Sequence, residues 1–236
     1  LLFGLSFFTA YFAYHIFTKK INNTSIWVAS NPLLLVTGPI ATKFKSQAHK
    51  RLLNRASYYL PFFLVGIFFF KIIAAPLTSF FWMLDLTNSI EVITFGLIFE
   101  LFIYFNFCGL SLIVFSIFGI FGVRIPLNFK QPFSSENIID YWKNWHISLS
   151  TVLKTLFYSP TRKNYPTSVA LFIVFISSAM WHGVTVNFAM WGIFHALMFI
   201  ITIKLLSKEY KILSTFLMIF AIIIGRVIFA DSETDR

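Results

Sequence analysis

The sequence is poor in charged residues, and above all in acidic ones. Lys, Arg, Asp and Glu make up 12% of its 236 residues, whereas a soluble domain usually contains about 25%. Nine Asp and Glu stand against nineteen Lys and Arg. Hydrophobic residues reach 58%, and 32 residues are Phe, nearly all of which a soluble fold would have to bury. The composition therefore excludes an ordinary soluble domain and predicts a chain embedded in membrane lipid.

Cysteine is also nearly absent, as are the motifs of nucleotide chemistry. A single Cys108 excludes a disulfide within the chain and a cysteine-based zinc site. There is no phosphate-cradling glycine loop, no cluster of zinc ligands and no nucleophile elbow. We therefore expect neither a nucleotide-driven pump nor a bound metal or cofactor. The net charge of +10 is typical of cytoplasmic loops that face anionic lipid headgroups, so nucleic acid is not an expected partner.

Neither end of the sequence looks like a natural terminus. The chain begins inside an apolar run without a Met, a basic region or a cleavage site, which differs from a signal peptide. It stops directly after another apolar run. We interpret residues 1–236 as a single membrane-embedded domain from the interior of a longer chain.

Six apolar segments are candidates for membrane spans, which need about 20 residues each. They are Leu1–Phe17, Tyr58–Ala75, Val92–Phe121, Tyr165–Trp181, Val184–Leu206 and Ile212–Phe229. A seventh segment, Ile26–Ile40, is broken by two X-Pro pairs and is expected to be re-entrant or interfacial. The predicted fold class is an all-α, polytopic membrane protein.

Basic residues fall on alternate connections between these segments. No Lys or Arg lies between Pro76 and Glu91 or in the turn after Trp181, whereas the other connections carry several. Cytoplasmic loops are enriched in Lys and Arg. We therefore expect the 76–91 loop and the turn after Trp181 to face the outside, and residues 124–163 to face the cytoplasm.

The segment Glu136–Leu156 is amphipathic rather than uniformly apolar. Residues 134–137, at its start, are of types that cap helices. As one helix it would place four apolar residues near one face: Ile138, Trp142, Trp145 and Leu149. Trp142 and His146, four residues apart, would then be neighbours. This pattern predicts a single helix that lies in the membrane interface or dips in from the cytoplasmic side.

His182 is the strongest candidate for a functional residue. It stands between Trp181 and Gly183, with long, almost uncharged stretches on both sides, and an ionisable group at membrane depth is a functional candidate by default. It is either a histidine in a turn at the outer interface or a neutral imidazole that acts as general base toward a hydroxyl.

Two further histidines need separate interpretations. His146 is either an interfacial residue bonded to a carbonyl or a polar group that lines a substrate path. His195 follows His182 by thirteen residues, about 220° around a helix, so we expect the two to face different ways. Haem ligation is not expected, because no second pair of histidines matches them.

Other polar residues in apolar segments leave alternatives open. Glu100 is a substrate contact, a proton relay or a protonated acid bonded to a neighbouring helix. Lys71 and Arg226 lie near span ends and are expected to reach toward the interface. Three asparagines are expected to form hydrogen bonds between helices: Asn106, Asn128 and Asn187.

Three motifs together resemble a known family. They are Val123–Phe133 (VRIPLNFKQPF), Tyr141–Thr151 (YWKNWHISLST) and Met180–Gly183 (MWHG). They are similar to the membrane-bound O-acyltransferase (MBOAT) superfamily, and most to its bacterial branch of alginate O-acetylation and teichoic-acid D-alanylation membrane proteins. Weaker likenesses at 4–9, 37–40, 103–109 and 226–230 extend the resemblance, in order, over nearly the whole chain.

The resemblance implies a funnel-shaped helical fold in the cell (inner) membrane. A donor such as acetyl-CoA or an acyl-carrier protein would deliver an acyl group, acetyl or D-alanyl, from the cytoplasmic side to a hydroxyl of an extracytoplasmic polysaccharide. His182 matches the catalytic histidine of the family, and His146 matches its second histidine near the cytoplasmic access path. A separate extracytoplasmic acyltransferase is an expected partner. We further expect five residues along the substrate path: Trp145, Trp181, Asn106, Glu100 and Asn187.

The sequence also departs from the family at several positions. The family commonly has Asp where this chain has Asn106, Ser at Cys108, another Asp near Leu112, and an Arg-Asp pair at Lys154-Thr155. Both histidines are present, but this acidic support is missing. The alternative hypothesis is therefore a non-catalytic polytopic protein, either a transporter or a degenerate relative that serves as a scaffold. A transporter would be favoured by matching broken helices in two halves, and the sequence shows one such break.

Overall fold

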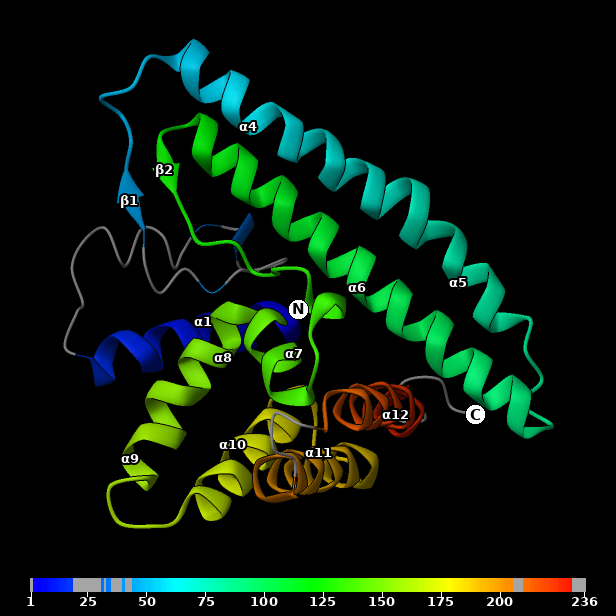
Figure 1. Cartoon of the computed structure of the whole chain (residues 1–236). Helices are drawn as coiled ribbons and strands as arrows, with labels where there is room; N and C mark the ends of the chain where they lie inside the picture. Colours follow the sequence, from blue (N-terminus) through cyan, green and yellow to red (C-terminus); the bar gives the residue numbers. More distant parts are fainter. Residues whose placement is uncertain are drawn as a thin grey trace. The chain divides into compact units, whose positions relative to one another are not determined.

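A computed structural model describes residues 2–18, 31, 33–34, 40, 44–205 and 210–230. Its helices (Figure 1) are α1 Leu2–Phe17, α4 Leu52–Ile67, α5 Ala75–Trp82, α6 Ser89–Ile120, α7 Ile138–Asn144, α8 Ile147–Leu153, α9 Ser159–Thr161, α10 Thr167–His182, α11 Val186–Leu205 and α12 Lys211–Ala230. Two-residue strands, β1 Lys45–Ser46 and β2 Val123–Arg124, pair antiparallel, with Lys45 opposite Arg124. The prediction of an all-α fold is confirmed.

Four helical stretches are long and apolar enough to cross a membrane: residues 52–80, 89–120, 186–203 and 211–230. They coincide with four of the expected spans. Helix α10 matches a fifth, although at 16 residues it is shorter than a full span. Most of Ile26–Ile40 lies outside the described residues, so its re-entrant character stays a prediction.

Helices α4 and α5 form one continuous rod through a π-helical stretch, Phe68–Ala74. Pro76 stands two residues after this stretch. Proline has no N–H to donate, and its ring collides with the carbonyl four residues earlier in a regular α-helix. A wider π turn before Pro76 relieves that collision, and this explains why the span continues past the proline.

The chain divides into two compact units. The first unit contains residues 1–76, 102–130 and 146–152, and the second unit contains residues 77–101, 131–145 and 153–236. The first unit has ten Lys and Arg and no acidic residue, whereas the second has nine of each sign. The positive net charge of the protein therefore comes from the first unit.

In the first unit, α4 and the C-terminal half of α6 approach each other at two glycines. A Cβ placed on Gly66 would lie 2.9 Å from the carbonyl oxygen of Gly109, and a Cβ on Gly109 would lie 2.8 Å from that of Gly66. Arg55 of α4 joins the two helices at another point, since its Nε donates to the carbonyl of Ile120 at the end of α6, at 3.0 Å. Small residues thus allow two long apolar helices to touch through their backbones.

The expected single helix over 136–156 is wrong. Helix α7 ends at Asn144, the chain is extended at Trp145, and α8 begins at Ile147. His146, between the two helices, has a φ of 42°. Trp142 and His146 are therefore not neighbours on one helix face, and the four apolar residues do not form one stripe. Periodicity missed this break because both halves are amphipathic at helical spacing.

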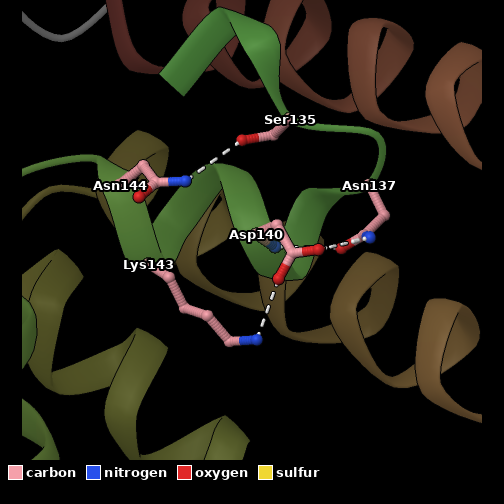
Figure 2. Close-up of polar contacts among 5 residues, drawn as sticks. All are labelled: Ser135, Asn137, Asp140, Lys143 and Asn144. Carbon is pink, nitrogen blue, oxygen red and sulfur yellow. Dashed lines mark hydrogen bonds and ion pairs between the residues drawn. The ribbon is translucent and has the colours of Figure 1, made fainter. Parts of the chain in front are cut away.

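The expected cap before this segment is confirmed. The side-chain oxygen of Asn137 accepts from the backbone N–H of Asp140 at 2.9 Å, and its amide donates to the Asp140 carboxylate at 2.8 Å (Figure 2). Lys143 binds the same carboxylate. Asn144 reaches the hydroxyl of Ser135 at 3.5 Å. These contacts fix both ends of α7 and with them Tyr141 within the helix and Trp145 directly after it.

In the second unit, α11 packs against both α10 and α12 (Figure 1). Gly192 of α11 faces the carbonyl of Phe175 on α10, where a Cβ would lie 2.9 Å from that oxygen. Gly225 of α12 faces the ring of His195 on α11. These close approaches place the C-terminal end of α10 beside both following helices.

Candidate functional site

His182 is the last residue of α10. The next residue, Gly183, is extended and is followed by exposed residues up to Val186. A Cβ on Gly183 would lie 2.6 Å from the ring of Phe188. Glycine therefore allows α11 to begin close against the end of α10, where the hydroxyl of Thr185 caps it by accepting from the N–H of Phe188 at 3.4 Å.

The half-buried imidazole of His182 is surrounded by four aromatic rings, which we call the aromatic wall: Trp181, Phe188, Trp191 and Phe229. The ring centroids lie 4.9, 5.9, 5.9 and 4.9 Å from that of His182, in the same order. The contact with Phe229 is edge-to-face at 84°. These rings give the imidazole a largely apolar surrounding.

The expectation for His182 and His195 treated them as residues of one continuous helix, and that premise is wrong. The chain turns at residues 183–185, so the two histidines belong to two helices, and Trp191 contacts both rings. His195 is 2% exposed, and its Nδ1 lies 3.1 Å from the carbonyl of Trp191. Its ring also packs against Trp142 at 5.3 Å. The angle of about 220° applies only within one continuous helix, and the turn at residues 183–185 separates the two histidines.

Glu100 and Arg226 form a buried ion pair in the second unit. Glu100 of α6 accepts from Arg226 Nε of α12 on one carboxylate oxygen and from the phenol of Tyr141 on the other. The Glu100 and Arg226 side chains are 4% and 8% exposed. Burial raises the pKa of Tyr141 well above its ordinary value of 10, which keeps the phenol a donor. Of the alternatives for Glu100, the structure shows a bond to a neighbouring helix.

The prediction that Arg226 reaches toward the interface is wrong. Its side chain turns inward to Glu100, with its guanidinium carbon 4.9 Å from the ring centroid of Trp145. A buried charge needs a partner of opposite sign. Glu100 and Arg226, one acid and one base within two apolar runs, are a sequence signal that could have revealed the pair.

His146 lies in the first unit, at the start of α8. Its Nδ1 accepts from the backbone N–H of Leu149 at 3.3 Å, so the imidazole caps the helix. A left-handed conformation costs a non-glycine residue about 1–3 kcal/mol and persists where its surroundings fix it. Burial lowers the pKa of His146 to about 4. The ring is therefore neutral at physiological pH, with its proton on Nε2 while Nδ1 accepts.

Hydrogen bonds to Asn128 fix the backbone that directly follows His146. Its side-chain oxygen accepts from both the N–H and the hydroxyl of Ser148, at 3.0 and 2.8 Å, and its carbonyl accepts from Ile147 N–H at 2.8 Å. The hydroxyl of Ser148 in turn accepts from Ile40 N–H at 3.0 Å. Asn128 therefore links two loops to the start of α8, rather than one helix to another.

Asn128→Ala is expected to destabilise the protein by about 2–4 kcal/mol, because it leaves buried donors of Ser148 without their acceptor. Ser148→Ala should cost less, since the backbone N–H keeps its bond to Asn128. The measurement is thermal unfolding of the purified protein in one detergent. Equal stability of Asn128→Ala and the parent would contradict this account.

The remaining expected path residues divide between the two units. Glu100, Trp145, Trp181 and Asn187 belong with His182 to the second unit, whereas Asn106 and His146 belong to the first. Asn106 and Asn187 are half-buried, in α6 and at the start of α11. Lys154 and Thr155, where the family commonly has Arg and Asp, lie in a π-helical stretch, Lys154–Tyr158. The roles of these residues stay predictions.

Sequence reasoning missed three members of the aromatic wall: Phe188, Trp191 and Phe229. In a chain with 32 Phe and six Trp, an aromatic residue near a histidine in space has no distinguishing signal in the sequence. Their proximity follows from the turn at 183–185 and from the packing of α12.

Comparison with known proteins shows the family to which this sequence belongs. The model of "MBOAT, membrane-bound O-acyltransferase family" matches residues 2–229. The chain belongs to this family. It is therefore part of a multi-pass integral membrane protein, as its apolar helices indicate.

Three curated relatives extend the comparison. The chain is 27% identical over 232 residues to "Probable alginate O-acetylase AlgI" of Pseudomonas syringae pv. tomato, covering 92% of this chain and 44% of that protein. It is 30% identical over 179 residues to a peptidoglycan O-acetyltransferase of Helicobacter pylori, covering 69% and 34%. It is 28% identical over 111 residues to a teichoic acid D-alanyltransferase of Bacillus subtilis, covering 42% and 28%. The chain thus spans less than half the length of these relatives.

Proposed function

We propose that this chain carries the transfer centre of a membrane O-acyltransferase. It would move an acyl group, in the first instance acetyl, from a thioester donor on the cytoplasmic side of the cell membrane to a hydroxyl of an extracytoplasmic polysaccharide. The observation that carries the proposal is the position of His182, at a helix end within the aromatic wall. The names of the relatives, which include two O-acetyl transfer proteins and one D-alanyltransferase, support the class of reaction.

The chemistry requires a base in a site with little water. The acceptor hydroxyl attacks the thioester carbonyl, the C–O ester bond forms and the C–S bond breaks. His182 would take the hydroxyl proton and return it to the departing thiolate, so that the products are an ester and a thiol. Apolar rings around the imidazole keep it neutral and exclude water that would hydrolyse the donor.

His146 would act elsewhere along the route. Its imidazole caps α8 through Nδ1, and we place the residue on the path by which the donor reaches the site. A donor such as acetyl-CoA or an acyl-carrier protein would enter on the cytoplasmic side, and a separate extracytoplasmic transferase would be a partner. These assignments extend the proposal and are tested with it.

The test measures ester-linked acyl groups on the cell-envelope polysaccharides, released with mild base and identified by mass. It compares cells with the full-length gene, its deletion, His182→Ala and His49→Ala at matched amounts of membrane protein. His49 is exposed and serves as the matched histidine control. We expect the ester to be lost in the deletion and in His182→Ala, and to persist in His49→Ala.

The other outcomes separate the alternatives. If the deletion loses the ester but His182→Ala keeps it, the protein is a scaffold or another group is the base. If the deletion leaves the ester unchanged, the protein does not acylate the envelope. The mass of the released acid distinguishes acetyl from D-alanyl.

A further inference from the structure

The guanidinium of Arg226 faces two aromatic rings as well as Glu100. Its central carbon lies 4.9 Å from the ring centroid of Trp145 and 5.8 Å from that of Phe229. Phe229 follows Arg226 by three residues on α12, so the two share one helix face. A cation within about 6 Å of a ring face is attracted to it. Arg226 therefore restrains one ring directly after α7 and one on α12 at the same time.

Phe229 connects this cation to His182. Its ring lies 4.9 Å from the imidazole, edge-to-face, and also touches Phe188 at 4.9 Å and Trp191 at 5.8 Å. Both of these rings contact His182 in turn. The orientation of Phe229 therefore decides how much room the imidazole has and in which direction it can point.

Glu100 holds the guanidinium in place. Arg226 and Tyr141 each donate to one of its two carboxylate oxygens. The three partners come from three helices, α6, α7 and α12. The carboxylate thus fixes the plane of the guanidinium relative to all three.

Stability alone does not explain a charged pair at this place. A buried ion pair is often matched or exceeded in stability by apolar residues of similar volume, because both charges lose their hydration. A planar guanidinium does offer a fixed direction and a flat face for aromatic rings. The pair is therefore better explained by the geometry that it imposes on Trp145 and Phe229.

We propose that Arg226, held in place by Glu100, is a positioning residue for His182. It orients Phe229, which in turn fixes the imidazole against the aromatic wall. The inference rests on the proposed function, because it presupposes that His182 acts on a substrate.

The test uses the full-length protein and compares single and double replacements of the pair. Glu100→Leu and Arg226→Met each leave one buried charge unpaired, so both should lose folded protein. All these variants are made in a Tyr141→Phe background, because Glu100→Leu would otherwise leave the buried Tyr141 phenol without its acceptor. In that background the double variant Glu100→Leu/Arg226→Met has neither charge and should recover folded protein to near the amount of its Tyr141→Phe parent. Thermal unfolding in one detergent measures the fold, and acyl transfer per folded molecule measures the site.

We expect the double variant to fold like the parent but to transfer about 10- to 100-fold more slowly at saturating substrate, since small misplacements at a reacting centre have effects of this size. KM for the acceptor should change by less than about threefold, because the pair does not touch substrate in this account. Arg226→Lys keeps the charge but loses the planar face. It should therefore fold, and should not restore the rate.

The exposed ion pair between Lys211 and Glu136 is the matched control. It also joins α12 to the segment before α7, and its side chains are 63% and 57% exposed. The variant Glu136→Gln/Lys211→Met should keep both fold and rate, because exposed pairs contribute little.

Two outcomes overturn the inference, and they are distinguishable. If Glu100→Leu/Arg226→Met recovers the parental rate together with the fold while His182→Ala is inactive, the pair has a structural role alone. If His182→Ala transfers as well as the parent, the proposed function fails and this inference fails with it.

Discussion

Gly109→Ala is expected to destabilise the protein by about 2–3 kcal/mol, although alanine favours an isolated helix over glycine by about 1 kcal/mol. The added methyl group would lie 2.8 Å from both the carbonyl oxygen of Gly66 and the N–H of Phe70. Both neighbours are backbone atoms of the rod formed by α4 and α5, and no side-chain rotation can move them. The two helices would have to separate and lose contact along the pair.

Thermal or denaturant unfolding in a fixed detergent measures this effect. Gly66→Ala should act in the same direction, since its Cβ would meet the Gly109 carbonyl at 2.9 Å. Ser57→Ala is the control, because Ser57 lies on the exposed side of α4 and gains helix propensity without meeting a neighbour. A Gly109→Ala protein as stable as the parent would show that the helices are not in backbone contact.

Gly225→Ala is expected to be destabilising by about 2–3 kcal/mol for a different reason. Its Cβ would lie 2.2 Å from Cε1 of His195, and that ring cannot move away. It is 2% exposed, bonded to the carbonyl of Trp191 and packed against Trp142 and Phe175. The added methyl group therefore clashes with the His195 ring, whose contacts prevent it from rotating away.

A double-mutant cycle tests the account, because His195→Ala removes the ring that Gly225→Ala meets. His195→Ala alone should cost about 2–4 kcal/mol by leaving a cavity. The double variant should be more stable than the sum of the two effects predicts, by about 1–2 kcal/mol. Additive effects would mean that the methyl group and the ring do not meet.

The spans could be read from the sequence because length and apolar composition are local properties. The segments expected at 58–75, 92–121, 184–206 and 212–229 each overlap a helix long enough to cross a membrane. The break at His146 could not be predicted, since it depends on Asn128, eighteen residues earlier, which supplies acceptors for the first N–H groups of α8. An amphipathic pattern is the same on both sides of such a break.

The site was predicted in part. His182 and His146 are marked by the motifs around them, and the family to which those motifs belong is confirmed. Their roles stay predictions. Arg226 was misassigned because its distance from the span end suggests a side chain that reaches water, whereas an acid 126 residues earlier holds it inside.

The sequence by itself determined that this protein is a helical membrane protein of the acyltransferase family. Hydrophobicity, the scarcity of charge and three short motifs are all legible along the chain. The tertiary structure alone decided which residues meet His182 and where the charge within the spans is neutralised. These depend on the packing of α6, α7, α11 and α12 against one another, and apolar helices of similar composition carry no signal for which faces meet. Glycines at the contacts and one buried ion pair select that packing, and their partners are visible only in three dimensions.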